Sequence, residues 1–405
     1  MLNSSSHKDS NLKSSFLYDV KPDICVYRGC PAPTVKTDSS SVEFFIEIKW
    51  NTCDDPFCVV DDENKSFLRD AKNAFNTLGQ ITAYAAVHLA AQFRMHVYLV
   101  FILRGTARIL RWDRSGTIVT EPIHYNKSPH LVEFFRRYSK ASDAMRGIDE
   151  SVSTPTTAEA RVARKALNIE AHIPLLKLSV PGPHGKTQYY ITAPPEPTLY
   201  TPPGRATRGF TAYDIQWQRL VFLKDSWRID LCDIMPEGQV YKILNTAKVK
   251  HVPTCLASGD ISASEYHTTK TQNYVTVPWN SSSHHPETRL IPHQHYRLIL
   301  DVIGQILVNF QSSREMVAAV WNGVIGKVLW IPQLDHTDVQ RCSALQEAFE
   351  AGILHRDFSP GNVIIDAARI GWLIDWDLSR PCHPQYDIET PRRATRTVRP
   401  HLRHT

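Results

Sequence analysis

The feature that most constrains this chain is a polar run close to its C-terminal end, His355-Arg356-Asp357, followed after four residues by Asn362. Thirteen residues beyond Asn362, the apolar run 371–374 (GWLI) ends at Asp375. Short apolar runs bounded by polar and glycine residues are typical of strands joined by turns. Residues 354–377 are therefore predicted to form a loop, a strand, a turn and a second strand that ends in a carboxylate.

The residue types in this run suit phosphoryl transfer. The spacing matches the H-R-D-x4-N catalytic-loop pattern, in which the aspartate accepts the proton of an attacking hydroxyl and the asparagine holds Mg²⁺. Asp357 and Asn362 fit these roles, and Asp375 fits that of a second magnesium ligand. The D-F-G position reads Asp375-Trp376-Asp377, so the aromatic side chain is kept and the glycine is missing. The pattern predicts a site for ATP and Mg²⁺.

Further residues of such a site lie upstream. Lys224 stands in the apolar run 221–224 (VFLK), where a lone buried cation would be costly unless it met phosphates and a carboxylate. Glu237 opens the predicted helix 236–249 and is the expected ion-pair partner. Gly204 and Gly209 bracket a candidate phosphate-covering loop, although the full G-x-G-x-x-G is absent.

Each of these residues also has a plain structural interpretation. An H-R-D triplet occurs by chance, Lys224 could lie at the surface of an edge strand, and Asp375 could cap a turn. The order of the residues along the chain, at this spacing, favours the functional interpretation.

The chain resembles the fungal-type protein kinase family. The likeness rests on GRATRGFTAYD, FLKDSW, HYRLILDVIG, SSREMV, AGILHRDFSPGN and LIDWDLS over about residues 200–397. It implies an α+β, bilobal protein-kinase-like domain at 204–405, with ATP and Mg²⁺ as cofactors and serine or threonine hydroxyls of a protein as acceptors. His355, Arg356, Asp357 and Lys224 would be its catalytic residues, and Glu237, Gly204 and Gly209 would complete the nucleotide site.

Two segments depart from the family. Residues 323–345 interrupt an expected helix with a sequence that contains Pro332, and the chain ends before the A-P-E-type anchor and the helices of the larger lobe. The resemblance therefore implies an atypical insertion and a C-terminally truncated larger lobe. It leaves open an active serine/threonine kinase, a catalytically impaired fragment of one and a pseudokinase that serves as an interaction module.

The N-terminal part has a pattern of its own. Residues 43–50, 96–103 and 106–112 are rich in β-branched and aromatic residues and predict strands, and 67–94 predict a helix. Asp23, Glu47-Ile48-Lys49 and Gln80 then resemble the restriction-endonuclease-like PD-(D/E)XK core, in which two carboxylates bind Mg²⁺ and a lysine steadies the attacking water. The resemblance implies a nuclease-like α/β domain at 16–150 and, as an alternative function, magnesium-dependent cleavage or binding of nucleic acid.

Composition sets wider limits. The 405 residues allow two or three domains, and the Pro-, Thr- and Ser-rich segment 151–203 predicts a linker with short strands. The net charge of +5 permits acidic partners such as nucleotides without singling out nucleic acid. No signal peptide and no apolar run of the roughly 20 residues that a bilayer span needs is found. We expect a cytoplasmic or nuclear protein with no membrane partner.

Overall fold

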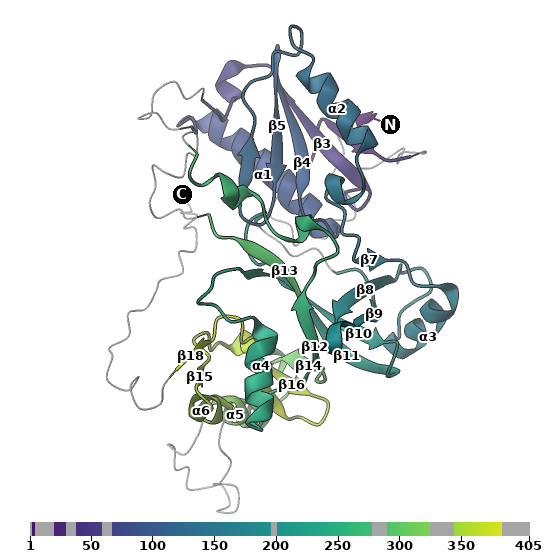
Figure 1. Ribbon diagram of the computed structural model, residues 1–405, viewed down its shortest axis with the longest axis vertical. Helices are drawn as coiled ribbons and strands as arrows, with labels where there is room; N and C mark the ends of the chain where they lie inside the picture. Colours follow the sequence, from purple (N-terminus) through teal and green to yellow (C-terminus); the bar gives the residue numbers. More distant parts are fainter. Residues whose placement is uncertain are drawn as a thin grey trace, which may run out of the picture. The chain divides into compact units, whose positions relative to one another are not determined.

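The computed structural model describes residues 2–4, 20–29, 38–58, 67–195, 201–277, 290–324 and 344–382. It forms two compact units, here called unit 1 (Met1–Gly238 and Thr254–Ile303) and unit 2 (Gln239–Pro253 and Gly304–Thr405), both visible in Figure 1. The mixture of sheets and helices confirms the predicted α+β class. Residues 325–343 of the predicted insertion, and the chain after residue 382, lie outside the described residues.

Unit 1 begins with a six-stranded sheet whose strands follow one another in sequence order. The strands are β1 (Leu2–Ser4), β2 (Ile24–Tyr27), β3 (Val42–Lys49), β4 (Val97–Leu103), β5 (Thr106–Trp112) and β6 (Thr117–Val119). The pair β3–β4 is parallel and is connected through helix α1 (Lys72–Ala91), whereas the other neighbours are antiparallel. The predicted helix and the three predicted strands are confirmed.

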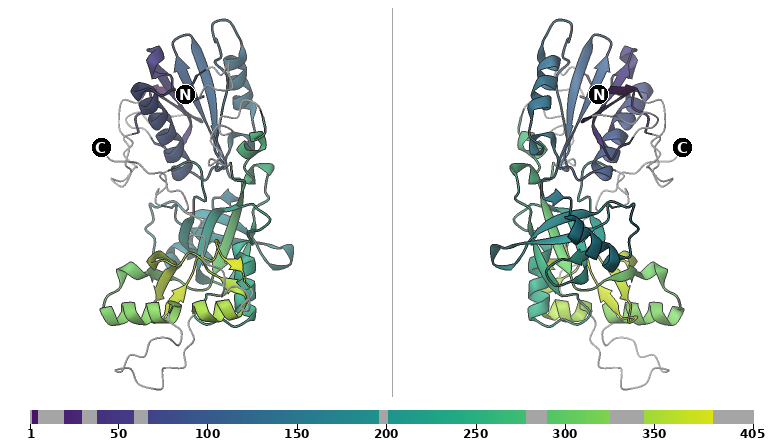
Figure 2. Two further views of the ribbon diagram at one scale, coloured as in Figure 1. Left: turned by 90° about the vertical axis from the view of Figure 1, so that its left-hand side faces the viewer. Right: turned by 90° about the vertical axis from the view of Figure 1, so that its right-hand side faces the viewer.

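A helix covers each face of this sheet (Figure 2). On one face Phe45 and Leu99 pack with Tyr84 of α1, and on the other Phe44 and Val100 pack against α2 (His130–Lys140). Successive residues of a strand point to opposite faces, so the apolar residues 44–46 of β3 supply both layers. Because both faces of β3 are covered, residues 42–47 are all buried, including Glu43 and Glu47.

The second sheet of unit 1 has seven strands in the order β12-β13-β11-β10-β9-β8-β7. They are β7 (Val152–Ser153), β8 (Leu176–Pro181), β9 (Thr187–Thr192), β10 (Arg208–Asp214), β11 (Arg219–Ile229), β12 (Cys255–Asp260) and β13 (His293–Leu300). Helix α3 (Thr157–Leu167) packs on β9 and β10 and begins with a capping box between Thr156 and Glu159. The segment 151–203 thus contributes three of the strands and a helix.

Two arginines join the sheets of unit 1. The guanidinium of Arg208 donates to the carbonyl oxygens of Leu89 (2.5 Å) and Gln92 (3.2 Å) at the C-terminal end of α1. Arg114, in the turn after β5, donates to Leu89 (3.4 Å) and to Pro202 (2.9 Å). Cations are favourable at this end of a helix because the last carbonyl groups have no partner within the helix.

Unit 2 is built around a small sheet of order β14-β16-β17, formed by Gly304–Ile306, Val363–Asp366 and Gly371–Leu373. A second ladder pairs β15 (Ile353–Leu354) with β18 (Arg380–Pro381). Helices α5 (Ser313–Val324) and α6 (Ala344–Glu350) pack here, and α4 (Glu237–Thr246) enters unit 2 from residue 239 onward. A Cβ on Gly371 would lie 2.5 Å from the Cα of Ala319, so α5 rests directly on β17.

Short 3₁₀ helices complete the described chain: η1 (Thr52–Asp54), η2 (Ala144–Arg146), η3 (Pro183–Gly185), η4 (Glu265–His267), η5 (Thr271–Tyr274), η7 (Leu307–Asn309) and η9 (Pro360–Asn362). Within the described residues, every helix is too short or too polar to cross a membrane.

Two glycines of unit 1 differ in the space that surrounds them. A Cβ on Gly238 would lie 1.9 Å from the Ser258 Oγ and 2.5 Å from the Tyr296 hydroxyl, whereas a Cβ on Gly79, exposed on α1, meets nothing within 4 Å. We expect Gly79→Ala to raise the free energy of unfolding by about 0.5–1 kcal/mol through helix propensity. Gly238→Ala should lower it by about 1–3 kcal/mol through overpacking. Urea unfolding followed by tryptophan fluorescence measures both, and equal effects would contradict the packing at Gly238.

Candidate functional site

Lys224 and Glu237 form a buried ion pair in unit 1. The Lys224 Nζ lies 2.8 Å from Glu237 Oε2, and the two side chains are only 7% and 4% exposed. Lys224 is held by β11, which pairs with β10 and β13 on either side, and Glu237 is the first residue of α4. The structure therefore brings together the two residues that the sequence predicted to pair.

The N-terminal end of α4, which begins at Glu237, is held in place by a hydrogen bond of the next residue. The backbone N–H of Gly238 donates to the hydroxyl of Tyr296, at 2.9 Å. Tyr296 lies on β13 between His295 and Arg297, and strand alternation places those two side chains on the opposite face. One face of the pair β11–β13 thus orients the Lys224–Glu237 ion pair.

In unit 2, His355 is a structural hub of the predicted catalytic loop. The side chain is 1% exposed and packs edge-on against Trp376, with ring centroids 4.5 Å apart. Its Nε2 lies 3.0 Å from the carbonyl oxygen of Ile374, and its Nδ1 accepts from the N–H of Asp357 at 3.4 Å. Burial lowers the pKa of His355, partly offset by the bond to Ile374, so the imidazole is neutral. A neutral ring with one donor and one acceptor nitrogen matches both contacts.

Asn362 ties the catalytic loop to the strand that precedes Asp375. Its Nδ2 donates to the backbone carbonyl of Asp357 at 2.6 Å, and its own carbonyl accepts from the N–H of Ile374 at 2.9 Å. Asp375 follows with a left-handed backbone (φ 66°), and Trp376 is fully buried beyond it. The loop and the strand end that the sequence predicted are therefore connected through one residue, Asn362, by its side chain and its backbone carbonyl. Asp357 and Asp375 are both half-buried.

The remaining predicted residues of the nucleotide site lie as follows. Arg356 is exposed and has a left-handed backbone (φ 69°). Gly209 lies on β10 directly opposite Lys224 in the strand pairing. Gly204 lies in the connection between β9 and β10 with φ 116°, and its N–H donates to the carbonyl of Arg114 at 2.9 Å.

The four residues of the predicted nuclease-like site also gather in unit 1. Asp23 precedes β2, and its Oδ2 accepts from the N–H of Ile48 on β3 at 2.8 Å. On the same strand, the Lys49 ammonium forms an ion pair with Oε1 of Glu47. Gln80 of α1 donates to the Tyr84 hydroxyl at 2.7 Å, which in turn donates to the carbonyl of Lys21, two residues before Asp23.

Glu47 is the most buried carboxylate of this group, at 1% exposure, and its Oε2 has no hydrogen-bond partner among the described residues. Burial raises the pKa of Glu47, Lys49 opposes the shift, and the charge of Asp23 adds to it. A buried carboxylate oxygen with no donor, close to a second carboxylate and a lysine, suits a site for a divalent cation.

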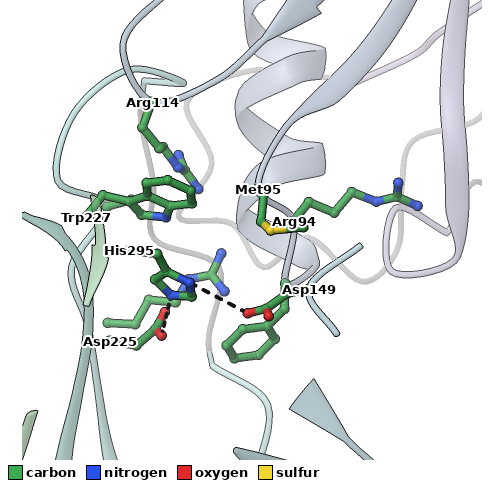
Figure 3. Close-up of a pocket in the computed structure, with 10 residues that line it drawn as sticks. Arg94, Met95, Arg114, Asp149, Asp225, Trp227 and His295 are labelled. Atoms are coloured by element: carbon green, nitrogen blue, oxygen red, sulfur yellow. Dashed lines mark hydrogen bonds and ion pairs between the residues drawn. The ribbon is translucent and has the colours of Figure 1, made fainter. Parts of the chain in front are cut away.

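One buried polar cluster of unit 1 was not predicted from the sequence. It combines Asp149, Asp225, His267, His295 and Arg297, and Figure 3 shows three of these side chains converging beside Trp227. The available signal was the alternation of His295 and Arg297 on β13, together with Asp225 on β11. Sequence spacing alone could not pair them with residue 149.

The Lys224–Glu237 ion pair predicts a measurable asymmetry in stability. Removing one member of a buried pair leaves the other charge in a site of low polarity and costs about 3–5 kcal/mol, whereas replacing both with apolar residues costs far less. We therefore expect Lys224→Met and Glu237→Leu each to lower the free energy of unfolding by about 3 kcal/mol. The double variant should recover at least half of that loss. Additive losses in urea unfolding would show that the pair is not coupled.

The family model described as fungal protein kinase matches residues 58–398, more than four-fifths of the chain. No curated protein matches the sequence. The matched segment contains the Lys224–Glu237 ion pair of unit 1 and, in unit 2, Asp357, Asn362 and Asp375. The chain belongs to the fungal protein kinase family.

Proposed function

We propose that this chain binds ATP with Mg²⁺ and transfers the γ-phosphoryl group to a serine or threonine hydroxyl of a protein. The observation that carries the proposal is the buried Lys224–Glu237 ion pair, with 2.8 Å between its charged atoms. A lysine held by a helix carboxylate in this way is the group that contacts the nucleotide phosphates in kinases. Buried ion pairs add little stability by themselves, which favours a functional reason for this one.

The catalytic loop supports the second half of the proposal. Asp357 would accept the proton of the hydroxyl while the oxygen–phosphorus bond forms and the bond between the β- and γ-phosphates breaks. Because the Nδ2 of Asn362 is used in the bond to Asp357, its Oδ1 is the atom that would hold Mg²⁺, together with the carboxylate of Asp375. The cation, when bound, neutralises charge that develops on the phosphate oxygens. Oxygen donors of this kind fit Mg²⁺.

Nucleotide binding and turnover can be tested separately. We expect MgATP to raise the melting temperature of the intact chain and of Glu350→Ala, an exposed carboxylate on α6, and to leave Asp375→Ala unshifted because a magnesium ligand is lost. Asp357→Asn should keep nucleotide affinity within about threefold and slow radiolabelled phosphotransfer about 10²–10⁴-fold. Absence of any shift would overturn the proposal. A shift without transfer, onto a mixture of protein substrates, would instead identify a nucleotide-binding pseudokinase.

A second function is favoured by the N-terminal sheet, where Asp23, Glu47 and Lys49 meet at adjacent strand ends. We propose that this group binds Mg²⁺ through its two carboxylates, with Lys49 next to them to stabilise charge on a phosphodiester during attack by water. The unpartnered Oε2 of Glu47 supports the cation site. The topology around it, with β3 and β4 parallel and α1 between them, supports a restriction-endonuclease-like core.

Plasmid DNA tests this second function. Incubation with the chain and Mg²⁺ should nick supercoiled DNA, and Glu47→Gln should abolish nicking because the buried cation ligand is lost. Glu265→Gln, which changes an exposed carboxylate elsewhere in unit 1, is the matched control and should cut normally. If the chain leaves DNA intact under these conditions, the N-terminal sheet has no nuclease activity.

A further inference from the structure

Four buried side chains of unit 1 contact one another in a row. Asp225 Oδ1 lies 2.8 Å from His295 Nε2, and the Nδ1 atoms of His295 and His267 are 2.9 Å apart. The far nitrogen of His267, Nε2, lies 3.6 Å from Asp149 Oδ1 and has no hydrogen-bond partner among the described residues. All four residues are at most 4% exposed. Two histidines thus link two carboxylates.

The positions of the protons on the two histidines follow from these contacts. His295 must donate from Nε2 to the carboxylate of Asp225, so its Nδ1 accepts the proton carried by His267 Nδ1. With both rings neutral, His267 Nε2 carries no proton and faces an oxygen of Asp149 that carries none either. His267 Nε2 and Asp149 Oδ1 are therefore two acceptors that face each other with no proton between them. A single added proton on His267 would supply the missing donor.

The surrounding charges are already balanced without that proton. Arg297 from β13 donates to Asp225 at 2.7 Å and to Asp149 at 2.9 Å, and the charge of Arg208 from β10 also acts on both carboxylates. These two cations offset the two carboxylates that face His267, so protonation would add one net charge to a buried site. Burial is the main reason that the pKa of His267 falls to about 4, and the charge of Asp149 opposes the shift.

A metal ion fits this geometry less well than a proton. The two imidazole planes are within 10° of each other and their centroids are 5.1 Å apart, so the Nδ1 atoms point at one another rather than at a third point. The carboxylate of Asp149 is also engaged by Arg297 and by the N–H of Ser151, at 2.9 Å. A divalent ion would bring two further positive charges next to Arg297.

His267 belongs to a strap that crosses from one sheet of unit 1 to the other. Two residues further on, Thr269 bonds to the backbone of His293 on β13. The N–H groups of Lys270 and Thr271 then donate to Asp113 Oδ2, at 2.9 and 3.0 Å, in the turn between β5 and β6 of the six-stranded sheet. The strap, residues 265–271, is thereby fixed at both sheets, with His267 at its buried end.

We infer that His267 is the proton-binding residue of a pH-sensitive strap: neutral His267 keeps residues 265–271 docked between the two sheets, and protonation releases them. Linkage between protonation and release sets the direction of the pH effect. A released histidine binds protons below its ordinary pKa of 6.5, while the docked one resists protonation until about pH 4. Acidification between these values therefore favours the released state.

Hydrogen exchange on the intact chain tests the strap directly. The two pKa values predict that opening of residues 265–271 rises about 30-fold between pH 7.5 and pH 5, after correction for intrinsic exchange rates. In His267→Asn the amide can still donate to His295 but cannot be protonated, so the rise should stay below about threefold. His172→Asn, which removes an exposed histidine that pairs with Glu170, should behave as the unmodified chain.

The test depends on whether the acid-induced rise in hydrogen exchange is confined to residues 265–271. His96 and His293 are also buried and have pKa values lowered to about 3 and about 4 by burial, so a general loss of stability in acid would not identify His267. Equal pH dependence of strap exchange in the unmodified chain and in His267→Asn would overturn the inference. A zinc-induced rise in melting temperature at pH 7.5 that His267→Asn abolishes would also overturn it, since the cluster would then bind a metal ion.

Discussion

Unit 1 depends on one guanidinium. Arg297 is completely buried and donates to Asp149, to Asp225 and to the backbone carbonyl of Ser179, at 2.7–2.9 Å. Burial would raise the pKa of Asp149, but the charge of the Arg297 guanidinium holds it below its usual range. A buried cation needs this number of acceptors because the cost of leaving water is otherwise not recovered. The contacts join the end of the N-terminal layer, β8 and β11 to one strand, β13.

The same two strands carry different chemistry on their two faces. On β11 and β13, Lys224 and Tyr296 face α4, whereas Asp225, His295 and Arg297 face the charge cluster. The cluster behind the strands therefore supports the ion pair in front of them without touching it. The Lys224–Glu237 ion pair and the strap therefore both depend on the packing of β11 and β13, although their side chains do not meet.

Local patterns predicted a large part of this structure. The spacing of apolar residues was sufficient for α1 and for β3 to β5, and the order of Lys224 and Glu237 was sufficient for their ion pair. The links among Asp357, Asn362 and Asp375 follow from one loop and its next strand. The charge cluster was missed because its members are separated by up to 148 residues, and no local period relates them. The segment 151–203 has a composition typical of linkers, and only long-range pairing reveals its strands.

The separation of Asp149 from Arg297 also has a consequence for biosynthesis. The carboxylate of Asp149 leaves the ribosome 148 residues before the guanidinium that neutralises it. At translation rates of about 5–20 residues per second, that interval lasts roughly 7–30 s. During this time the six-stranded sheet can form, because its strands are neighbours in sequence, but the seven-stranded sheet lacks β13 between β11 and β12. An exposed edge of β11 in a nascent chain is a place where a chaperone would be expected to bind.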